Sequence, residues 1–130
     1  MLELLVVIII VGILAALAFP NFYRARESAL EKEAQTNLRL ISAAEKILYM
    51  ETNLYLTGTS DLDTINTTLK VSIPAAQNWN YKIDAGNDGT GFLAKAQRVN
   101  NAAVVWCITQ ATDAPYDADA GCSWDDVVIR

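Results

Sequence analysis

One carboxylate, Glu3, precedes a long run of uncharged residues that extends over positions 4–23. An uncompensated carboxylate at membrane depth costs about 2.5 kcal/mol or more, and a helix N-terminus recovers only about 0.3 to 1 kcal/mol of that. No basic side chain lies in this stretch, so the only cation available there is an α-amino group. We expect Glu3 to pair with the amine of a neighbouring copy of the chain. The alternative is that Glu3 extends to the membrane interface from its position near the chain end.

The other candidates for chemistry are two cysteines, Cys107 and Cys122, in a chain that has no histidine. The absence of histidine removes the commonest metal ligand and general base, and two cysteines alone cannot complete a four-ligand zinc site. No glycine pattern accompanies a phosphate-binding lysine. We therefore expect neither an enzyme nor a cofactor. For the cysteines we expect a disulfide, with two free buried thiols as the alternative.

Aspartates are concentrated around Cys122, and carboxylate oxygens are ligands that Ca²⁺ prefers. The group comprises Asp113, Asp117, Asp119, Asp125 and Asp126. Their spacing matches no recognised calcium signature, so we favour a solvated acidic loop, with Asp117, Asp119 and Asp125 as candidate calcium ligands. Asn66-Thr67-Thr68 fits a glycosylation sequon, which predicts an exposed loop at Asn66. The net charge of −5 argues against broad nucleic-acid binding, which needs clustered Lys and Arg.

The apolar run is long enough to serve as a membrane anchor. Residues 4–19 would span about 24 Å as a helix, and continuation to Tyr23 reaches the thickness of a hydrocarbon core of about 30 Å. A removable signal peptide would need a preceding basic region, which the chain lacks. Arg24 and Arg26 follow the run and would place the head in the cytoplasm by the positive-inside rule, which conflicts with a disulfide. We expect a processed form whose basic leader has been removed, so that Met1 need not be the initiator.

The stretch LELLVVIIIVGILAALAFPNF resembles the N-terminal segment of mature type IV pilins and of the related type II secretion pseudopilins. Glu3 stands at the family's acidic position, Gly12 lies within the apolar helix and Pro20 lies at its end. Family members usually carry Phe-Thr ahead of the segment, where this chain has Met1 and Leu2. The resemblance covers about 25 residues closely.

The resemblance implies a homo-oligomeric helical filament in which Glu3 neutralises the N-terminal amine of an adjacent subunit. It also implies an inner-membrane stage with the head outside the cytoplasm, processing by a prepilin peptidase, and export by pilus or secretion machinery to an extracellular pilus. Such filaments support adhesion, motility or DNA uptake. Between Gly12 and Pro20, family precedent includes local unwinding in filaments, and a simple bend at Pro20 is the alternative.

Two other functions remain open at this point. The chain could be a pseudopilin in the short periplasmic piston of a type II secretion system. It could also be a membrane-tethered binding module, or an enzyme that uses the acidic loop. Filaments on cell surfaces favour the pilin, whereas monomers that persist despite an intact Glu3 favour the third possibility.

The periodicity of the apolar residues predicts the helices and strands that carry these side chains. Apolar residues at steps of three and four continue the helix over residues 21–52 and predict a face that packs on a sheet. The members of this face are Leu30, Ala34, Leu38, Ile41, Ala44 or Glu45, and Leu48. Turn-forming residues between Thr52 and Asp63 end the helix, and Asp61 or Asp63 caps a short following turn.

The C-terminal half predicts antiparallel strands. Trp79, Tyr81 and Ile83 alternate with polar residues, and residues 92–97 alternate again after a turn-forming stretch, which is typical of a hairpin. Residues 102–109 predict a buried strand and residues 127–129 a short edge strand. The expected fold is therefore α+β, a long N-terminal helix packed on an antiparallel sheet.

We expect the chain to have three parts. Residues 1–23 form the hydrophobic transmembrane and assembly segment, residues 24–52 the amphipathic half of the helix, and residues 53–130 the head. The head includes a loop that joins helix to sheet. In pilins a disulfide commonly encloses a C-terminal surface loop, and the resemblance assigns that role to Cys107 and Cys122. We expect the tryptophans to fill the core.

Overall fold

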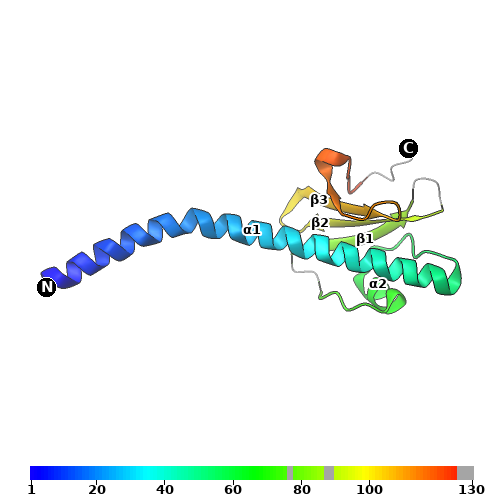
Figure 1. The fold of residues 1–130 in the computed structure, drawn as a ribbon, viewed down its shortest axis with the longest axis horizontal. Coiled ribbons are helices and arrows are strands. Elements are labelled where there is room, and N and C mark those ends of the chain that lie inside the picture. The colour runs from blue at the N-terminus through cyan, green and yellow to red at the C-terminus, as the bar shows by residue number, and fades with distance from the viewer. Residues whose placement is uncertain (76–77, 87–89, 126–130) are drawn as a thin grey trace. The chain divides into compact units, whose positions relative to one another are not determined.

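The computed structural model describes residues 1–75, 78–86 and 90–125 (Figure 1). Its first element is the helix α1 (Leu2–Thr52), which is followed by the short helix α2 (Leu62–Leu69) and an antiparallel sheet. This α+β architecture confirms the predicted fold class. By its internal contacts, the chain forms two compact units, Met1–Lys32 and Glu33–Arg130. The predicted edge strand at residues 127–129 lies outside the described residues.

Within the first unit, α1 is helical without interruption through Gly12 and Pro20. Pro20 has no backbone N–H, so the carbonyl of Ala16 lacks its usual donor there. Beyond its chain neighbours and the backbone of its own helix, a Cβ added to Gly12 would meet no atom within 4 Å, so packing within the chain does not require a glycine at this position. Unwinding between Gly12 and Pro20 in assembled filaments stays a prediction.

In the second unit, one face of α1 packs on the sheet, as the periodicity predicted (Figure 1). Leu38 and Ile41 are fully buried there, and they share a core with Tyr81 and Phe92 from the sheet. Asn37, on the same helix, donates a hydrogen bond of 2.8 Å from Nδ2 to Oη of Tyr81. Burial of this face fixes the helix against the sheet, because each large aliphatic side chain removed from water contributes about 1.5 to 3 kcal/mol.

The segment after α1 contains a helix that we did not predict. Asp61 is its N-cap, since its side chain accepts a 3.0 Å hydrogen bond from the backbone N–H of Thr64. We expected only a short turn here, because the stretch up to Asp63 is rich in turn-forming residues. Asp and Thr also have low helix propensity. Burial of Ile65 and Leu69, which lie four residues apart and contact the core, outweighs that propensity. Asp61 as a cap is confirmed.

We expect Asp61→Ala to lower the free energy of unfolding of the head by about 1 kcal/mol, because an N-cap side chain satisfies an otherwise unpaired helix N–H. Urea unfolding followed by tryptophan fluorescence measures this difference. Asp63→Ala is the matched control, since Asp63 is also exposed but lies inside the helix. Equal destabilisation by the two substitutions would contradict the capping role.

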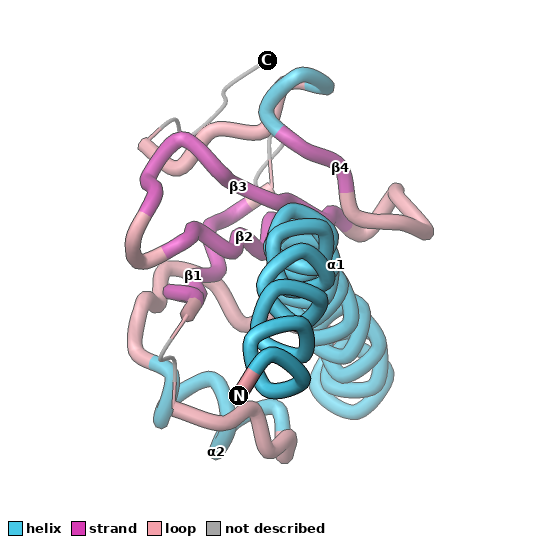
Figure 2. Tube along the Cα trace, turned by 90° about the vertical axis from the view of Figure 1, so that its left-hand side faces the viewer, coloured by secondary structure: helices cyan, strands magenta, loops and turns pink. Residues whose placement is uncertain are grey.

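The sheet has the order β1-β2-β3-β4, and all of its neighbouring strands are antiparallel (Figure 2). Its strands are β1 (Trp79–Ala85), β2 (Phe92–Arg98), β3 (Asn101–Thr109) and β4 (Tyr116–Asp117), followed by a single 3-10 turn, η1 (Ala118–Ala120). The predicted hairpin is confirmed, and so is a strand over residues 102–109. Its predicted burial holds only in the second half, because Ala102 and Ala103 are exposed. The two-residue strand β4 was not predicted.

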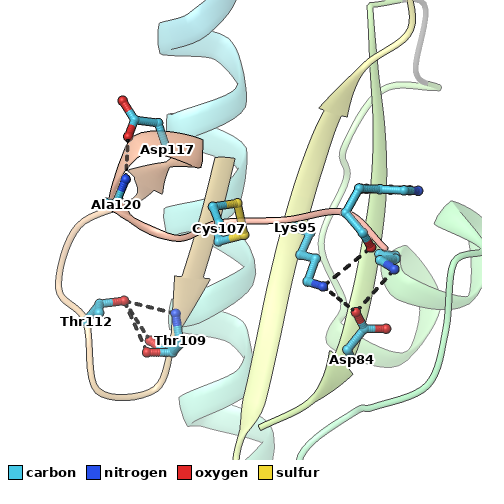
Figure 3. Close-up of a disulfide and its surroundings, with 10 residues drawn as sticks. Asp84, Lys95, Cys107, Thr109, Thr112, Asp117 and Ala120 are labelled. Atoms are coloured by element: carbon cyan, nitrogen blue, oxygen red, sulfur yellow. Dashed lines mark hydrogen bonds and ion pairs between the residues drawn. A yellow bond between two sulfur atoms is a disulfide. The ribbon is translucent and has the colours of Figure 1, made fainter. Parts of the chain in front are cut away.

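The face of the sheet away from α1 is covered by the C-terminal loop. Cys107 of β3 forms a disulfide with Cys122, with a Cα–Cα distance of 5.6 Å (Figure 3). The predicted disulfide is therefore confirmed. The two cysteines belong to a second apolar cluster, which also contains Leu93, Val105, Tyr116 and Trp124. Trp79 is buried in the main core, as expected of a tryptophan that fills space.

A charged group lies beneath this loop. The side chain of Lys95 is fully buried, and its Nζ lies 3.1 Å from Oδ2 of Asp84 and 3.5 Å from the backbone carbonyl of Trp124 (Figure 3). Lys82 lies 3.3 Å from the same carboxylate oxygen and 4.8 Å from the centre of the Trp124 ring. The buried ammonium thus has a counter-ion, as a charge taken out of water requires.

Candidate assembly interface

Glu3 lies in the first turn of α1 and is exposed. Among the residues that the structure describes, no ion pair involves Glu3. The helix N-terminus favours a nearby carboxylate by about 0.3 to 1 kcal/mol, which is less than the cost of placing that charge in apolar surroundings. In the described part of a single chain, therefore, the charge of Glu3 is compensated only by the helix dipole.

The apolar residues that follow Glu3 are exposed along the whole length of the segment. Leu4 is 65% exposed, Leu14 61% and Tyr23 60%, although side chains of these types are normally buried in a folded protein. An 18-residue window of α1 has a mean hydropathy of 3.0, and none of it is buried. By length and composition, α1 can cross a membrane; a signal sequence meets the same criteria. A continuous apolar surface of this size needs lipid or protein to cover it.

Around the disulfide, the structure does not bring the calcium candidates together. Oδ1 of Asp117 accepts a hydrogen bond of 3.2 Å from the N–H of Ala120, which caps the 3-10 turn (Figure 3). Asp119 and Asp125 are exposed. Within residues 1–75, 78–86 and 90–125, no group of three or more His, Cys, Asp or Glu side chains could hold a metal ion. Asp126 lies outside these ranges, and the structure gives the calcium hypothesis no support.

Asn66 does not lie in an exposed loop, so that expectation was wrong. It lies in α2 and is half-buried, and both ends of its amide bind the backbone of Ile73. Nδ2 donates to the carbonyl of Ile73 at 2.9 Å, and Oδ1 accepts from its N–H at 2.9 Å. These bonds fix the chain after α2 against the helix. Glycosylation at Asn66 stays a prediction without structural support, because a glycan on Nδ2 would disrupt this pairing.

Sequence reasoning did not foresee that Glu45 is a buried acid. Its side chain lies on the face of α1 that packs on the sheet and is fully buried. Oε2 accepts a 2.9 Å hydrogen bond from the N–H of Leu56, whereas Oε1 is buried without a partner among the described residues. Desolvation raises the pKa of Glu45 from 4.5 to about 7, against the opposing effect of the Leu56 hydrogen bond. The sequence contained one indication of this burial, because Glu45 stands in a helix face whose other members are apolar.

Comparison with known proteins identifies a relative among the pilins. The chain is 40% identical over 55 residues to the type IV major pilin protein PilA of Myxococcus xanthus (strain DK1622). The match spans 42% of this chain and 25% of the length of that pilin. No protein-family model matches the chain, and no solved structure matches it. Together with the apolar N-terminal helix, the antiparallel sheet and the disulfide, this similarity supports placing the chain in the type IV pilin family.

Proposed function

We propose that this chain is a structural subunit of a type IV pilus filament. The observation that carries the proposal is the helix over residues 1–23, which exposes its apolar side chains and begins with a carboxylate that has no ion-pair partner among the described residues. A surface of this kind suits a protein that must always be covered, first by lipid and later by other copies. The similarity to a major pilin supports the same conclusion.

The same segment serves both stages, because the side chains that suit lipid can also pack against one another. Between Leu4 and Tyr23 it presents a continuous surface without charged side chains. In lipid, helix association depends on close packing and on polar contacts rather than on the hydrophobic effect. Outside the membrane, each large apolar side chain left in water would cost about 1.5 to 3 kcal/mol, so the segment must be covered by protein there.

Glu3 gives this packing its alignment. We propose that its carboxylate pairs with the N-terminal amine of an adjacent subunit, because residues 1–23 contain no basic side chain. Two opposite charges in apolar surroundings attract strongly, and each is costly if left alone. The pairing would favour one axial register of neighbouring helices over the others.

Assembly into a pilus also implies where the subunit lies before and after assembly and which proteins it meets. The inner membrane holds the subunit before assembly, with the head outside the cytoplasm, where the Cys107–Cys122 disulfide is stable. Prepilin peptidase and the pilus assembly machinery are the expected protein partners. The finished filament lies outside the cell and supports adhesion, motility or DNA uptake.

Isolation of surface fibres tests this function. Cells that express the chain are sheared, and the released fraction is examined by electron microscopy and mass spectrometry. We expect long fibres in which this chain is the main protein. Short assemblies confined to the periplasm would instead identify a pseudopilin. A chain that remains monomeric in the membrane and never enters a fibre would overturn the proposal.

A further inference from the structure

Asn21 is the only amide side chain in the apolar segment. Between Leu4 and Phe22 every other residue is apolar. Asn21 is exposed, and no described residue forms a hydrogen bond with its side chain. The amide group has two N–H donors and one carbonyl acceptor. Because an unpaired amide is costly where water is excluded, Asn21 needs a partner once the apolar helices are packed in a filament.

The same segment contains a backbone acceptor that lacks its usual donor. Pro20 has no N–H, so the carbonyl of Ala16, four residues earlier, does not receive the hydrogen bond that a helix normally provides. An unsatisfied carbonyl is costly both in hydrocarbon and in a dry protein core. Ala16 is exposed and its side chain is only a methyl group, so another helix can approach this carbonyl closely.

The donor and the acceptor cannot pair within one chain. Five residues separate Ala16 from Asn21, so at about 100° per residue the two positions lie about 140° apart around the helix. Along the helix axis they are about 7.5 Å apart. An asparagine side chain is too short to span this angle and this distance. Each copy of the chain therefore presents an unpaired donor on one side of α1 and an unpaired acceptor on another.

We infer that the Asn21 side chain of one subunit donates a hydrogen bond to the Ala16 carbonyl of an adjacent subunit in the filament. The inference rests on the proposed function and names a polar contact that aligns the packed helices. Since the donor and the acceptor lie on different sides of the helix, two copies alone would leave one of each unpaired. A head-to-tail contact of this kind repeats from copy to copy, which suits a helical filament.

The direction of this contact agrees with the pairing proposed for Glu3. For parallel helices, placing Ala16 of the neighbour beside Asn21 shifts that neighbour by about 7.5 Å toward the C-terminal end of the first helix. Pairing of Glu3 with a neighbour's N-terminal amine also shifts the neighbour toward this end, because the amine precedes Glu3 in the chain. Both contacts therefore favour the same sense of stagger between neighbouring helices.

The amide is not an obstacle to the membrane stage. Asn21 lies near the end of the apolar run, three residues before Arg24, so water and lipid head groups can satisfy its amide there. Packing of the helices in a filament removes that water, and the amide must then exchange it for a protein acceptor. The hydrogen bond is therefore gained only on assembly.

Solid-state NMR of mixed filaments tests the contact directly. Half of the subunits carry a carbon isotope label at the alanine carbonyls, and the other half carry a nitrogen isotope label at the asparagine side-chain amides. Magnetisation transfer between the two labels then arises only between subunits. We expect a cross-peak that disappears when Asn21→Leu subunits carry the nitrogen label. Asn80→Leu, at an exposed position of β1, should leave this cross-peak in place.

A double-mutant cycle with Pro20 provides the second measurement. We expect Asn21→Leu to lower filament yield about fivefold or more, because the Ala16 carbonyl loses its donor. In a Pro20→Ala background the helix regains an N–H that satisfies this carbonyl, so Asn21→Leu should no longer lower the yield. Asn80→Leu should leave the yield unchanged in both backgrounds. Unfolding of the head should be unaffected by changes at positions 20 and 21, since these lie outside the head unit.

The outcomes separate this inference from the proposed function. Filaments without the cross-peak that depends on Asn21, or equal losses of yield from Asn21→Leu in the two backgrounds, overturn the hydrogen bond and leave the pilin function standing. If the unmodified chain forms no filaments under any condition, the proposed function is overturned, and the hydrogen bond with it.

Discussion

Replacing Glu3 by glutamine is expected to lower filament yield about tenfold or more while the head remains folded. The substitution keeps the shape of the side chain and removes its charge. A neighbouring amine would then lie in apolar surroundings without a counter-ion, at a cost of about 2.5 to 3.5 kcal/mol. Since each 1.4 kcal/mol corresponds to about a tenfold change in an equilibrium constant, this loss is large enough to suppress assembly.

The measurement is the amount of chain in sheared fibres, normalised to the amount in the membrane. Asp119→Asn removes one carboxylate from an exposed position of the head and serves as the matched control, with a yield that we expect to equal that of the unmodified chain. Unfolding of the head should be the same in all three proteins. A normal fibre yield from Glu3→Gln would show that Glu3 has no role in pairing subunits.

The head is expected to lose stability as the pH rises from 4.5 to about 7, because Glu45 is buried. Burial raises the pKa of its carboxyl from 4.5 to about 7, so the unfolded chain releases this proton at a lower pH than the folded chain does. The contribution of Glu45 to stability is therefore complete below pH 4.5, is lost as the pH rises through about 7 and changes no further above that. A pKa change of this size corresponds to about 3 kcal/mol.

Glu45→Gln isolates this effect, since glutamine can still accept the hydrogen bond from the N–H of Leu56 but does not ionise. Urea unfolding of the full chain in detergent, at about pH 4.5 and about pH 8, gives the free energies to compare. We expect the variant to gain about 3 kcal/mol relative to the unmodified chain between these two values. Glu33→Gln, at an exposed position of α1, should leave the pH dependence unchanged. An identical pH dependence in the Glu45→Gln protein would contradict the account.

The parts of the fold that sequence predicts well are those in which a regular pattern coincides with burial. The steps of three and four from Ala34 to Ile41 predicted the inner face of α1, because a helix that packs on a sheet must place its apolar residues on one side. The alternation of Trp79, Tyr81 and Ile83 predicted β1 for the corresponding reason in a strand. The disulfide followed from two cysteines in a chain that was expected outside the cytoplasm.

Features that depend on contacts between distant residues were not predictable in this way. The helix α2 exists because Ile65 and Leu69 reach the core, although the local propensity is low. The bonds between Asn66 and Ile73 replace the exposed loop that the sequon suggested, since an asparagine amide can pair with a backbone segment several residues away. Burial of Glu45 depends on where the segment at Leu56 folds back on α1, and a helical pattern alone does not contain that information.

Part of the candidate interface could be predicted from the sequence alone. Glu3 and the apolar run are visible in the sequence, and the structure adds that no described residue covers them. The exposed apolar residues of α1 within the head unit, in contrast, become recognisable only once the sheet is known to occupy another face of the helix. Leu40 and Ile47 would otherwise be taken for further core residues.

The most direct test of the central claim is an electron cryomicroscopy structure of the assembled filament at side-chain resolution. The helices of residues 1–23 should pack together inside the filament, and the carboxylate of Glu3 should lie within about 4 Å of the N-terminal amine of another subunit, the distance of an ion pair. If Glu3 faces open water in the filament, or if these helices do not touch one another, subunits do not assemble through Glu3 and the apolar helix.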